Sequence, residues 1–281
     1  MAEEIGSKPI DVQTLENIDS FDDLPDVTEL TEEQLYAIRS GDLSSDYIAP
    51  FEWDGTSYEK WRSIIDGQAI TEIPDSEDLH AHYDFSEYDT SQTSNLEDLS
   101  GNGRVLNEGS ISGYGEINGV QAAQFDGDSD ELFGPTFDSL EESSVFAVVE
   151  VDSDGFDDRM VVVNTTQSDN EQIRWWGDDN EWQNIAVNIV SGTDNIDANL
   201  IGATHSSDGR ITIREDGTET GSDDGGKDAF DAIGIGSRSP NVASRFFMGK
   251  IGEVLVYPDD SSDRLGEVES YLSDKWGVSL S

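Results

Sequence analysis

The stretch of residues 245–281 constrains the fold more than any other part of this chain. Within it, residues 250–257 (KIGEVLVY) alternate loosely and then fill with β-branched and aromatic side chains, as in a half-buried strand that enters a core. Pro258 ends this strand because proline cannot donate to a ladder, and the acidic cluster at 259–263 is suited to capping a helix. One apolar stripe at spacings of three and four, stopped by Gly277, then indicates an amphipathic helix: Leu265, Val268, Leu272 and Trp276.

The chain before this stretch consists mainly of short strand patterns separated by turns. Runs 145–149 and 160–163 are continuously apolar, as central strands between two layers require. Residues 74–78 (PDSED) indicate a domain boundary. For residues 79–281 the pattern predicts an all-β, antiparallel β-sandwich with one C-terminal helix. Its expected strands are 83–86, 105–107, 120–125, 144–151, 160–165, 172–176, 182–190, 200–204, 211–215, 232–236 and 246–257.

Four motifs, in this order, resemble the laminin-G-like and concanavalin-A-like β-sandwiches, a family of lectins and glucanases. They are residues 82–86 (HYDFS), 98–103 (DLSGNG), 118–122 (NGVQA) running into 125–130 (FDGDSD), and 249–257 followed by the helix that ends at 271–277 (YLSDKWG). The resemblance implies a concanavalin-A-like jelly roll for residues 79–281. It says little about the ligand, because one fold hosts many functions.

Residues 1–78 differ from the rest and are expected to form a small mixed segment. A capping box at 31–34 (TEEQ) predicts a short helix over 35–39, and the Asp-Gly pair inside 51–58 predicts a hairpin. Two interpretations remain open: a small β-cap on the sandwich, or a docking and oligomerisation module. In the second, the groups that bind a partner or a sister chain are Phe51, Trp53, Tyr58 and Trp61.

The net charge of −47, from 62 acidic and 15 basic residues, sets the conditions under which this chain folds. Such a charge is strongly self-repelling at ordinary ionic strength, whereas in molar salt the Debye length falls to roughly 3 Å. The acidic residues lie among strand patterns along the whole chain, so they do not form a disordered tail. A high-salt habitat is expected, with a Ca²⁺-binding surface as the alternative. Nucleic acid is excluded as a partner, because phosphate binding needs clustered Lys and Arg.

The sequence lacks cysteine, a secretion signal and a membrane-spanning run. There is no cysteine, which excludes disulfides and thiolate chemistry. Residues 1–7 have neither a basic nor an apolar region, so we expect no secretion signal. No run approaches the ~18 apolar residues of a membrane span.

Catalytic motifs are weak. The nearest match to the paired carboxylates of glucanases, E-x-D-x-E, is residues 150–154 (EVDSD), in which Asp154 replaces the last Glu. His80, His82 and His205 are the only histidines, and no Ser lies in a G-x-S-x-G setting. We therefore expect no catalytic residue and no enzyme.

A metal site is a second candidate. Asp126 and Asp128 begin an alternation of carboxylates like that of an EF-hand loop, but Glu131 stands where the loop needs Gly, and Phe137 where it needs Glu. Laminin-G-like domains often hold one Ca²⁺ near a sandwich rim, so the resemblance implies that Asp126 or Asp128 could take part. No cofactor is required; Ca²⁺ is the candidate ion, and turn acids adapted to salt are the alternative.

Residues 174–182 (RWWGDDNEW) are the predicted ligand site. They are typical of a hairpin whose polar tip is flanked by tryptophans, and sugars bind an aromatic face together with polar acceptors. Neighbouring tryptophans in a strand face opposite sides, so one of Trp175 and Trp176 is expected in the core. The predicted ligand-binding residues are Trp175, Trp176, Asp178 and Trp182, with structural tryptophans as the alternative.

Together these features favour a binding or structural protein. The chain resembles, in style, a structural protein of a haloarchaeal tailed virus: a tail fibre, spike or capsid turret that binds a host glycan or S-layer glycoprotein. Other virion proteins would be held through residues 1–78, in a homo-oligomer, trimer or pentamer, exposed on the virion. The alternatives are a secreted or cell-surface haloarchaeal glycan-binding protein and a β-glucan hydrolase.

Overall fold

The computed structural model describes residues 73–152, 159–164, 173–176, 181–185, 189–193, 199–224, 230–238, 245–262 and 264–281, together with 35–39 and 48–52. For 35–39, 48–52, 159, 160 and 176 it describes the backbone alone. The chain divides into two compact units, Met1–Thr71 and Glu72–Ser281. In the first unit, β1 (Leu35–Arg39) and β2 (Ile48–Glu52) pair as an antiparallel hairpin.

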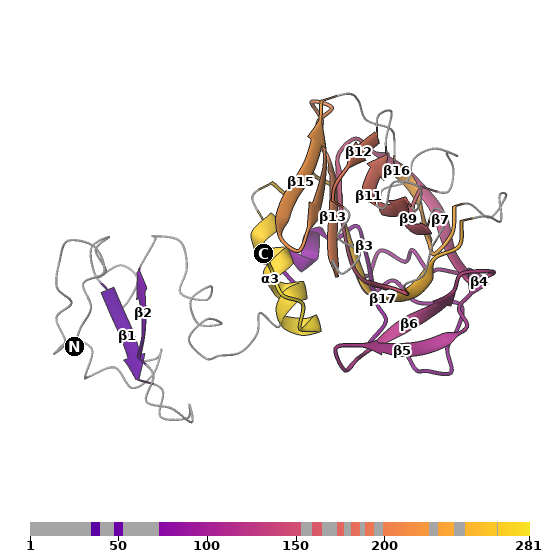
Figure 1. Cartoon of the computed structure of the whole chain (residues 1–281), viewed down its shortest axis with the longest axis horizontal. Helices are drawn as coiled ribbons and strands as arrows, with labels where there is room; N and C mark the ends of the chain where they lie inside the picture. Colours follow the sequence, from indigo (N-terminus) through magenta and orange to yellow (C-terminus); the bar gives the residue numbers. More distant parts are fainter. Residues whose placement is uncertain are drawn as a thin grey trace. The chain divides into compact units, whose positions relative to one another are not determined.

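Two antiparallel sheets face each other in the second unit (Figure 1). The first has seven strands in the order β12 (Ile189–Ser191), β11 (Glu181–Ile185), β10 (Ile173–Trp176), β9 (Arg159–Val163), β16 (Phe230–Ile235), β7 (Glu131–Leu140) and β4 (Glu108–Ser110). The second has eight: β15 (Thr218–Asp223), β14 (Ile211–Glu215), β13 (Leu200–His205), β8 (Ser143–Val151), β17 (Met248–Tyr257), β6 (Val120–Asp126) and β5 (Gly113–Ile117), with β3 (Ala81–Asp84) also paired to β17. The predicted antiparallel β-sandwich is therefore confirmed.

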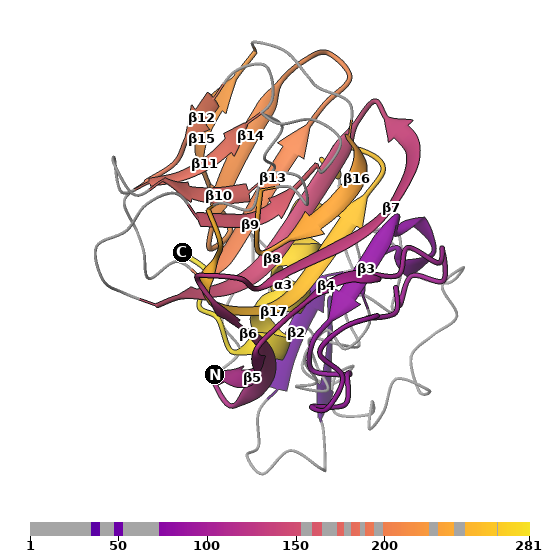
Figure 2. The same ribbon diagram turned by 90° about the vertical axis from the view of Figure 1, so that its right-hand side faces the viewer.

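The hydrophobic core lies between these sheets. The two apolar runs form inner strands as predicted, because β8 lies between β13 and β17, and β9 between β10 and β16 (Figure 2). Each large apolar side chain that the core removes from water contributes roughly 1.5–3 kcal/mol. The largest members of the core include Tyr83, Phe85, Phe125, Trp182, Phe230 and Phe247.

Helix α3 (Leu265–Trp276) covers the face of the eight-stranded sheet that points away from the other sheet, where it contacts β8 and β13 (Figure 1). Its buried side is the predicted stripe, with Val268, Leu272 and Trp276 fully buried. The helix ends as predicted, because Gly277 adopts a left-handed conformation with φ 63°.

The described acidic residues before α3, Asp259 and Asp260, do not cap the helix as expected, and Asp263 lies outside the described residues. The N-cap residue is Arg264, which makes no side-chain cap hydrogen bond. Asp259 Oδ1 instead accepts the Ser261 N–H at 2.9 Å, and Asp260 Oδ1 accepts the Ser262 N–H at 3.2 Å. These short side chains bond the backbone two residues ahead, so they stabilise the turn that precedes the helix.

Residues 73–78 belong to the sandwich unit, and they include the short 3₁₀ helix η3 (Ser76–Asp78). Tyr257 Oη donates to the carbonyl of Pro74 at 2.7 Å, and Arg264 Nε lies 3.3 Å from the Asp75 carboxylate. The structural division lies between Thr71 and Glu72, whereas the sequence placed it between 78 and 79.

Three predictions of local structure were wrong. The helix expected over 35–39 is strand β1, because Tyr36 and Ile38 favour strands and so short a helix is costly to nucleate. Residues 105–107 form only an isolated bridge, between Leu106 and Leu96, and β4 begins at Glu108. The single strand expected over 182–190 is the antiparallel pair β11 and β12.

Candidate functional site

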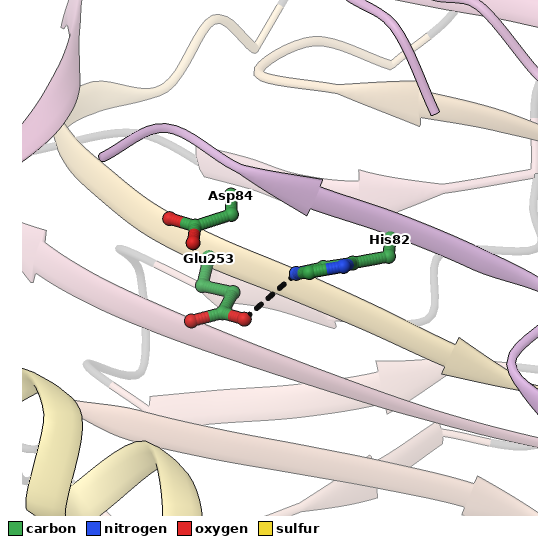
Figure 3. A group of neighbouring side chains, drawn as sticks. All are labelled: His82, Asp84 and Glu253. Atoms are coloured by element: carbon green, nitrogen blue, oxygen red, sulfur yellow. Dashed lines mark hydrogen bonds and ion pairs between the residues drawn. The ribbon is translucent and has the colours of Figure 1, made fainter. Parts of the chain in front are cut away.

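A group of buried charged side chains lies between β17 and α3. Glu253 is fully buried in β17, and the strand register places Asp84 beside Glu253 and His82 beside Leu255. Figure 3 shows the His82 ring directed at Glu253, with the Asp84 carboxylate next to both. Possible ligand atoms of His82, Asp84 and Glu253 lie within 4.8 Å of one another, and among the described residues no other three His, Asp or Glu side chains do so.

Helix α3 supplies the remaining partners of Glu253. The Oε1 atom of Glu253 lies 2.8 Å from His82 Nε2 and accepts a hydrogen bond from Tyr271 Oη at 3.0 Å. Its Oε2 atom accepts from Trp276 Nε1 at 2.8 Å and lies 2.8 Å from Lys275 Nζ. Both carboxylate oxygens therefore have two partners. Lys275 also donates to Asp84, which ties β3 to the helix.

The charges of this network stabilise one another. Burial alone would raise the pKa of Glu253, but the hydrogen bond from His82 and the charge of Lys275 hold that pKa below its ordinary value. Burial likewise disfavours the charged form of Lys275, yet the carboxylates of Glu253 and Asp84 raise its pKa well above the ordinary value. Glu253 and Lys275 therefore form a charged pair at neutral pH.

These contacts attach α3 to the eight-stranded sheet, and their charges disfavour a metal ion between the three side chains. The Lys275 ammonium already contacts both Asp84 and Glu253, so a divalent cation would meet a positive charge at contact distance. Residues from two of the four sequence motifs meet here: 82–86, and 249–257 with the helix that ends at 271–277. Sequence reasoning recognised these motifs but assigned no role to Glu253, and the acid within an otherwise apolar strand was the available signal.

A row of polar side chains crosses β10, β11 and β12 on the face opposite the core. In the register, Arg174 pairs with Gln183, and Gln183 pairs with Ser191. Arg174 Nε and Nη2 both donate to Gln183 Oε1, at 2.8 and 2.5 Å. Gln183 Nε2 and Ser191 Oγ both donate to Glu181 Oε1, at 2.6 and 2.5 Å. We call Arg174, Gln183, Ser191 and Glu181 the polar ladder.

The polar ladder carries groups suited to a ligand rich in hydroxyls. Arg174 and Gln183 are almost fully buried, at 5% and 4% exposure, whereas Glu181 and Ser191 are half-buried. Glu181 Oε2 has no hydrogen-bond partner among the described residues, which leaves an acceptor at the accessible end. The backbone of Trp176 pairs with Glu181, so this predicted ligand residue lies next to the ladder in the register. The more accessible groups, the Glu181 carboxylate and the Ser191 hydroxyl oxygen, can accept hydrogen bonds from hydroxyl groups.

Two of the predicted ligand-binding tryptophans belong to the core. Trp175 and Trp182 are 3% and 0% exposed, and their rings pack edge to face with centroids 5.3 Å apart. Neither ring presents a face to solvent, which matches the structural alternative that the sequence left open. The side chain of Trp176 and the whole of Asp178 lie outside the described residues.

Asp126, the first metal candidate, closes a turn. Its Oδ1 atom accepts the backbone N–H groups of Asp128, Ser129 and Asp130, at 2.9, 2.9 and 3.2 Å. Burial would raise the pKa of Asp126, but these hydrogen bonds hold it below its ordinary value. Asp128 is exposed. Ca²⁺ binding by Asp126 or Asp128 stays a prediction.

Glu150, from the near-match to the glucanase carboxylates, forms an ion pair with Lys250 of β17. Asp154 lies outside the described residues. His205 Nε2 lies 2.8 Å from the Asn184 amide oxygen, in the core. The expectation that the protein is not an enzyme stays a prediction.

Of the predicted docking residues, Phe51 is in β2, where the backbone alone is described. Trp53, Tyr58 and Trp61 lie outside the described residues. In the described part of the chain, no helix is long and apolar enough to cross a membrane.

Comparison with known proteins supports the fold. No family model matches the sequence, and no curated protein is significantly similar to it. Among solved structures, the chain is similar to the receptor binding domain of botulinum neurotoxin D (14% identity, TM-score 0.50, 69% of this chain and 52% of that one). It is also similar to the binding domain of Paraclostridial Mosquitocidal Protein 1 (13%, 0.49, 69% and 52%). A third similar structure is domain 4 of a GH43 extracellular arabinanase from Geobacillus stearothermophilus, in complex with arabinotriose (18%, 0.43, 68% and 98%).

This chain thus spans about half the length of the toxin structures and nearly all of the arabinanase domain. At these identities the likeness establishes the β-sandwich fold alone.

Proposed function

We propose that this protein is a virion structural protein, a tail fibre, spike or capsid turret, that presents a carbohydrate-binding β-sandwich in high salt. The polar ladder is the observation that carries the binding part of this proposal. Its side chains lie on a sheet face turned away from the core, and hydrogen bonds hold them in place before any ligand arrives. A site held in this way loses little side-chain entropy on binding.

The chemistry of the ladder favours a glycan. Among the described residues Glu181 offers a carboxylate oxygen without a hydrogen-bond partner and Ser191 a half-buried hydroxyl oxygen, and both can accept hydrogen bonds from sugar hydroxyls. A sandwich of the same fold is the receptor binding domain of botulinum neurotoxin D, so the fold is compatible with a recognition role. Glu150 is neutralised by Lys250, which supports a role without catalysis.

The proposal of a virion protein in high salt is supported by the net charge and by the division of the chain into two units. A net charge of −47 suits a protein that works in molar salt. The separate first unit, Met1–Thr71, is compatible with docking to other virion proteins and with a trimer or pentamer held through Phe51, Trp53, Tyr58 and Trp61. Repetition in such an oligomer lets weak glycan contacts add up. Mass spectrometry of purified virions tests this setting, and absence of the chain from all particles would contradict it.

Glu181→Gln tests the binding site. The amide keeps the Oε1 acceptor that Gln183 and Ser191 use, but it replaces the unpaired oxygen with a donor. On a glycan array in molar KCl we expect the full-length protein to bind a defined subset of glycans, and the variant to bind them at least ~10-fold more weakly, a loss of about 1.4 kcal/mol.

Glu219→Gln is the matched control. Glu219 is on β15 of the other sheet, where it pairs with Arg210 at 2.7 Å, and its substitution removes the same charge. This variant should bind as the natural protein does. No glycan binding by the full-length chain, or equal binding by both variants, would refute the proposed site.

A further inference from the structure

Arg104 lies on the connection between β3 and β4, and its backbone is fixed from two sides. Its N–H donates to Asp98 Oδ2 at 3.0 Å, and its carbonyl accepts from Tyr83 Oη at 2.7 Å. Its guanidinium carbon lies 5.2 Å from the centre of the Phe137 ring on β7. These contacts fix the position of the Arg104 side chain in the fold.

The guanidinium of Arg104 has no carboxylate partner among the described residues, although the chain has 62 acidic residues. Nη2 donates to His80 Nδ1 at 3.1 Å, while Nε and Nη1 are buried and have no hydrogen-bond partner in the part of the chain that the structure describes. Other arginines behave differently: Arg210, Arg214 and Arg264 each pair with Asp or Glu side chains. Among the described residues the Arg104 guanidinium thus forms no ion pair, although the backbone N–H of Arg104 contacts the Asp98 carboxylate.

His80 adds a further unused donor. A guanidinium can only donate, so Nδ1 of His80 must accept, and the imidazole proton lies on Nε2. Burial, followed by the charge of Arg104, lowers the pKa of His80 to about 4, so the ring is neutral near pH 7. The Nε2 atom of His80 is also buried, and no described residue forms a hydrogen bond with it. The ring packs edge to face on Phe137 with centroids 4.4 Å apart, which holds it against Arg104.

We propose that Arg104 binds the carboxylate of an acidic sugar, with His80 and Phe137 as positioning residues. Buried donors without partners are costly, and a carboxylate both accepts their hydrogen bonds and balances the charge. Arg104 as a whole is partly exposed, whereas its Nε and Nη1 atoms are buried, so the side chains that cover these donors must open for a ligand to reach them. Molar salt screens the repulsion between an anion and the acidic surface. The attraction between the partly buried donors and the anion is screened much less. The sugar part of this inference rests on the proposed glycan-binding function.

The test is an NMR titration of the ¹⁵N-labelled full-length protein in constant molar KCl, following the Arg104 Nε–H and His80 ring signals. We expect sodium glucuronate to shift both signals saturably and glucose, its neutral counterpart, to shift neither. Acetate should bind at least fivefold more weakly than glucuronate, because it lacks the sugar ring. In Arg104→Gln the His80 signals should no longer respond, whereas in Arg210→Gln, which alters an arginine already paired with Glu219, the response should persist.

The absence of a saturable shift with glucuronate, an equal shift with glucose, or a response retained in Arg104→Gln would overturn the proposal. Acetate that binds as tightly as glucuronate would overturn the assignment to a sugar acid. If Arg104→Gln does not fold, the titrations of the natural protein decide the matter alone. Because Glu181→Gln leaves Arg104 in place, failure of this site and failure of the polar ladder are distinguished.

Discussion

At the scale of single residues, Gly252 limits how closely α3 approaches the sheet. A Cβ atom at this position would lie 2.6 Å from the Trp276 ring. Gly252→Ala should therefore lower the free energy of unfolding by roughly 1–3 kcal/mol, because the ring must move. Gly266→Ala, in α3 with nothing within 4 Å of the new Cβ, should raise it by about 0.5 kcal/mol. Urea denaturation in molar KCl measures both; equal effects would show that Gly252 is not needed for this packing.

His205 makes stability depend on pH. Burial lowers its pKa from 6.5 to about 4. The unfolded chain therefore takes up the proton first as pH falls, so the stability that neutral His205 provides is complete above pH 6.5 and is lost between 6.5 and about 4. The shift corresponds to about 3 kcal/mol over the whole window.

His205→Gln keeps a donor for Asn184 but does not titrate. We expect the variant to lose less stability than the natural protein when denaturation is measured at pH 6.5 and again near pH 4. His80 titrates with the same sign, so part of the slope should remain. An unchanged slope would mean that folding does not lower the pKa of His205.

Single residues also mark the limit of sequence reasoning about the site. Alternation predicted correctly that one of Trp175 and Trp176 lies in the core, but the packing of Trp175 on Trp182 depends on the register of β10 and β11, which no local pattern encodes. Glu253 was recognised only as part of the motif at 249–257, without a role of its own. Its partner His82 is 171 positions away in the sequence, and its buried environment arises only when β3, β17 and α3 meet.

At the scale of elements, α3 depends on the buried charge of Glu253. Glu253→Gln should lower the free energy of unfolding by about 3 kcal/mol, because Lys275 loses a partner and an amide cannot accept all four hydrogen bonds. The matched control is Glu150→Gln, which removes a partly exposed ion pair with Lys250 and should cost under about 1 kcal/mol. Denaturant titrations compare the two, and equal costs would show that the α3 network is no more important than a surface pair.

Two strands that the sequence did not predict, β7 and β15, lack a clear strand pattern for different physical reasons. β7 contains Gly134 and Pro135, which resemble a turn; the strand accommodates them at a register shift against β16. β15 has no apolar residue, because it is an edge strand that buries little. The inner strands β8 and β17 were predicted because burial on both faces leaves continuous apolar runs.

At the scale of the whole molecule, the net charge of −47 should make folding depend on salt. We expect the melting temperature to rise steeply between about 0.1 M and about 3 M KCl, because the Debye length shortens and self-repulsion is screened. Circular dichroism at the two concentrations measures the change. A melting temperature that does not change would contradict the high-salt account.

We propose that the sandwich binds glycan on the face of β10, β11 and β12. Amide hydrogen exchange of the full-length protein, with and without a glycan that it binds on the array, tests that location most directly. We expect slower exchange in residues 173–176, 181–185 and 189–191 when the glycan is bound. Protection confined to another part of the sandwich, such as β5 and β6, would contradict it.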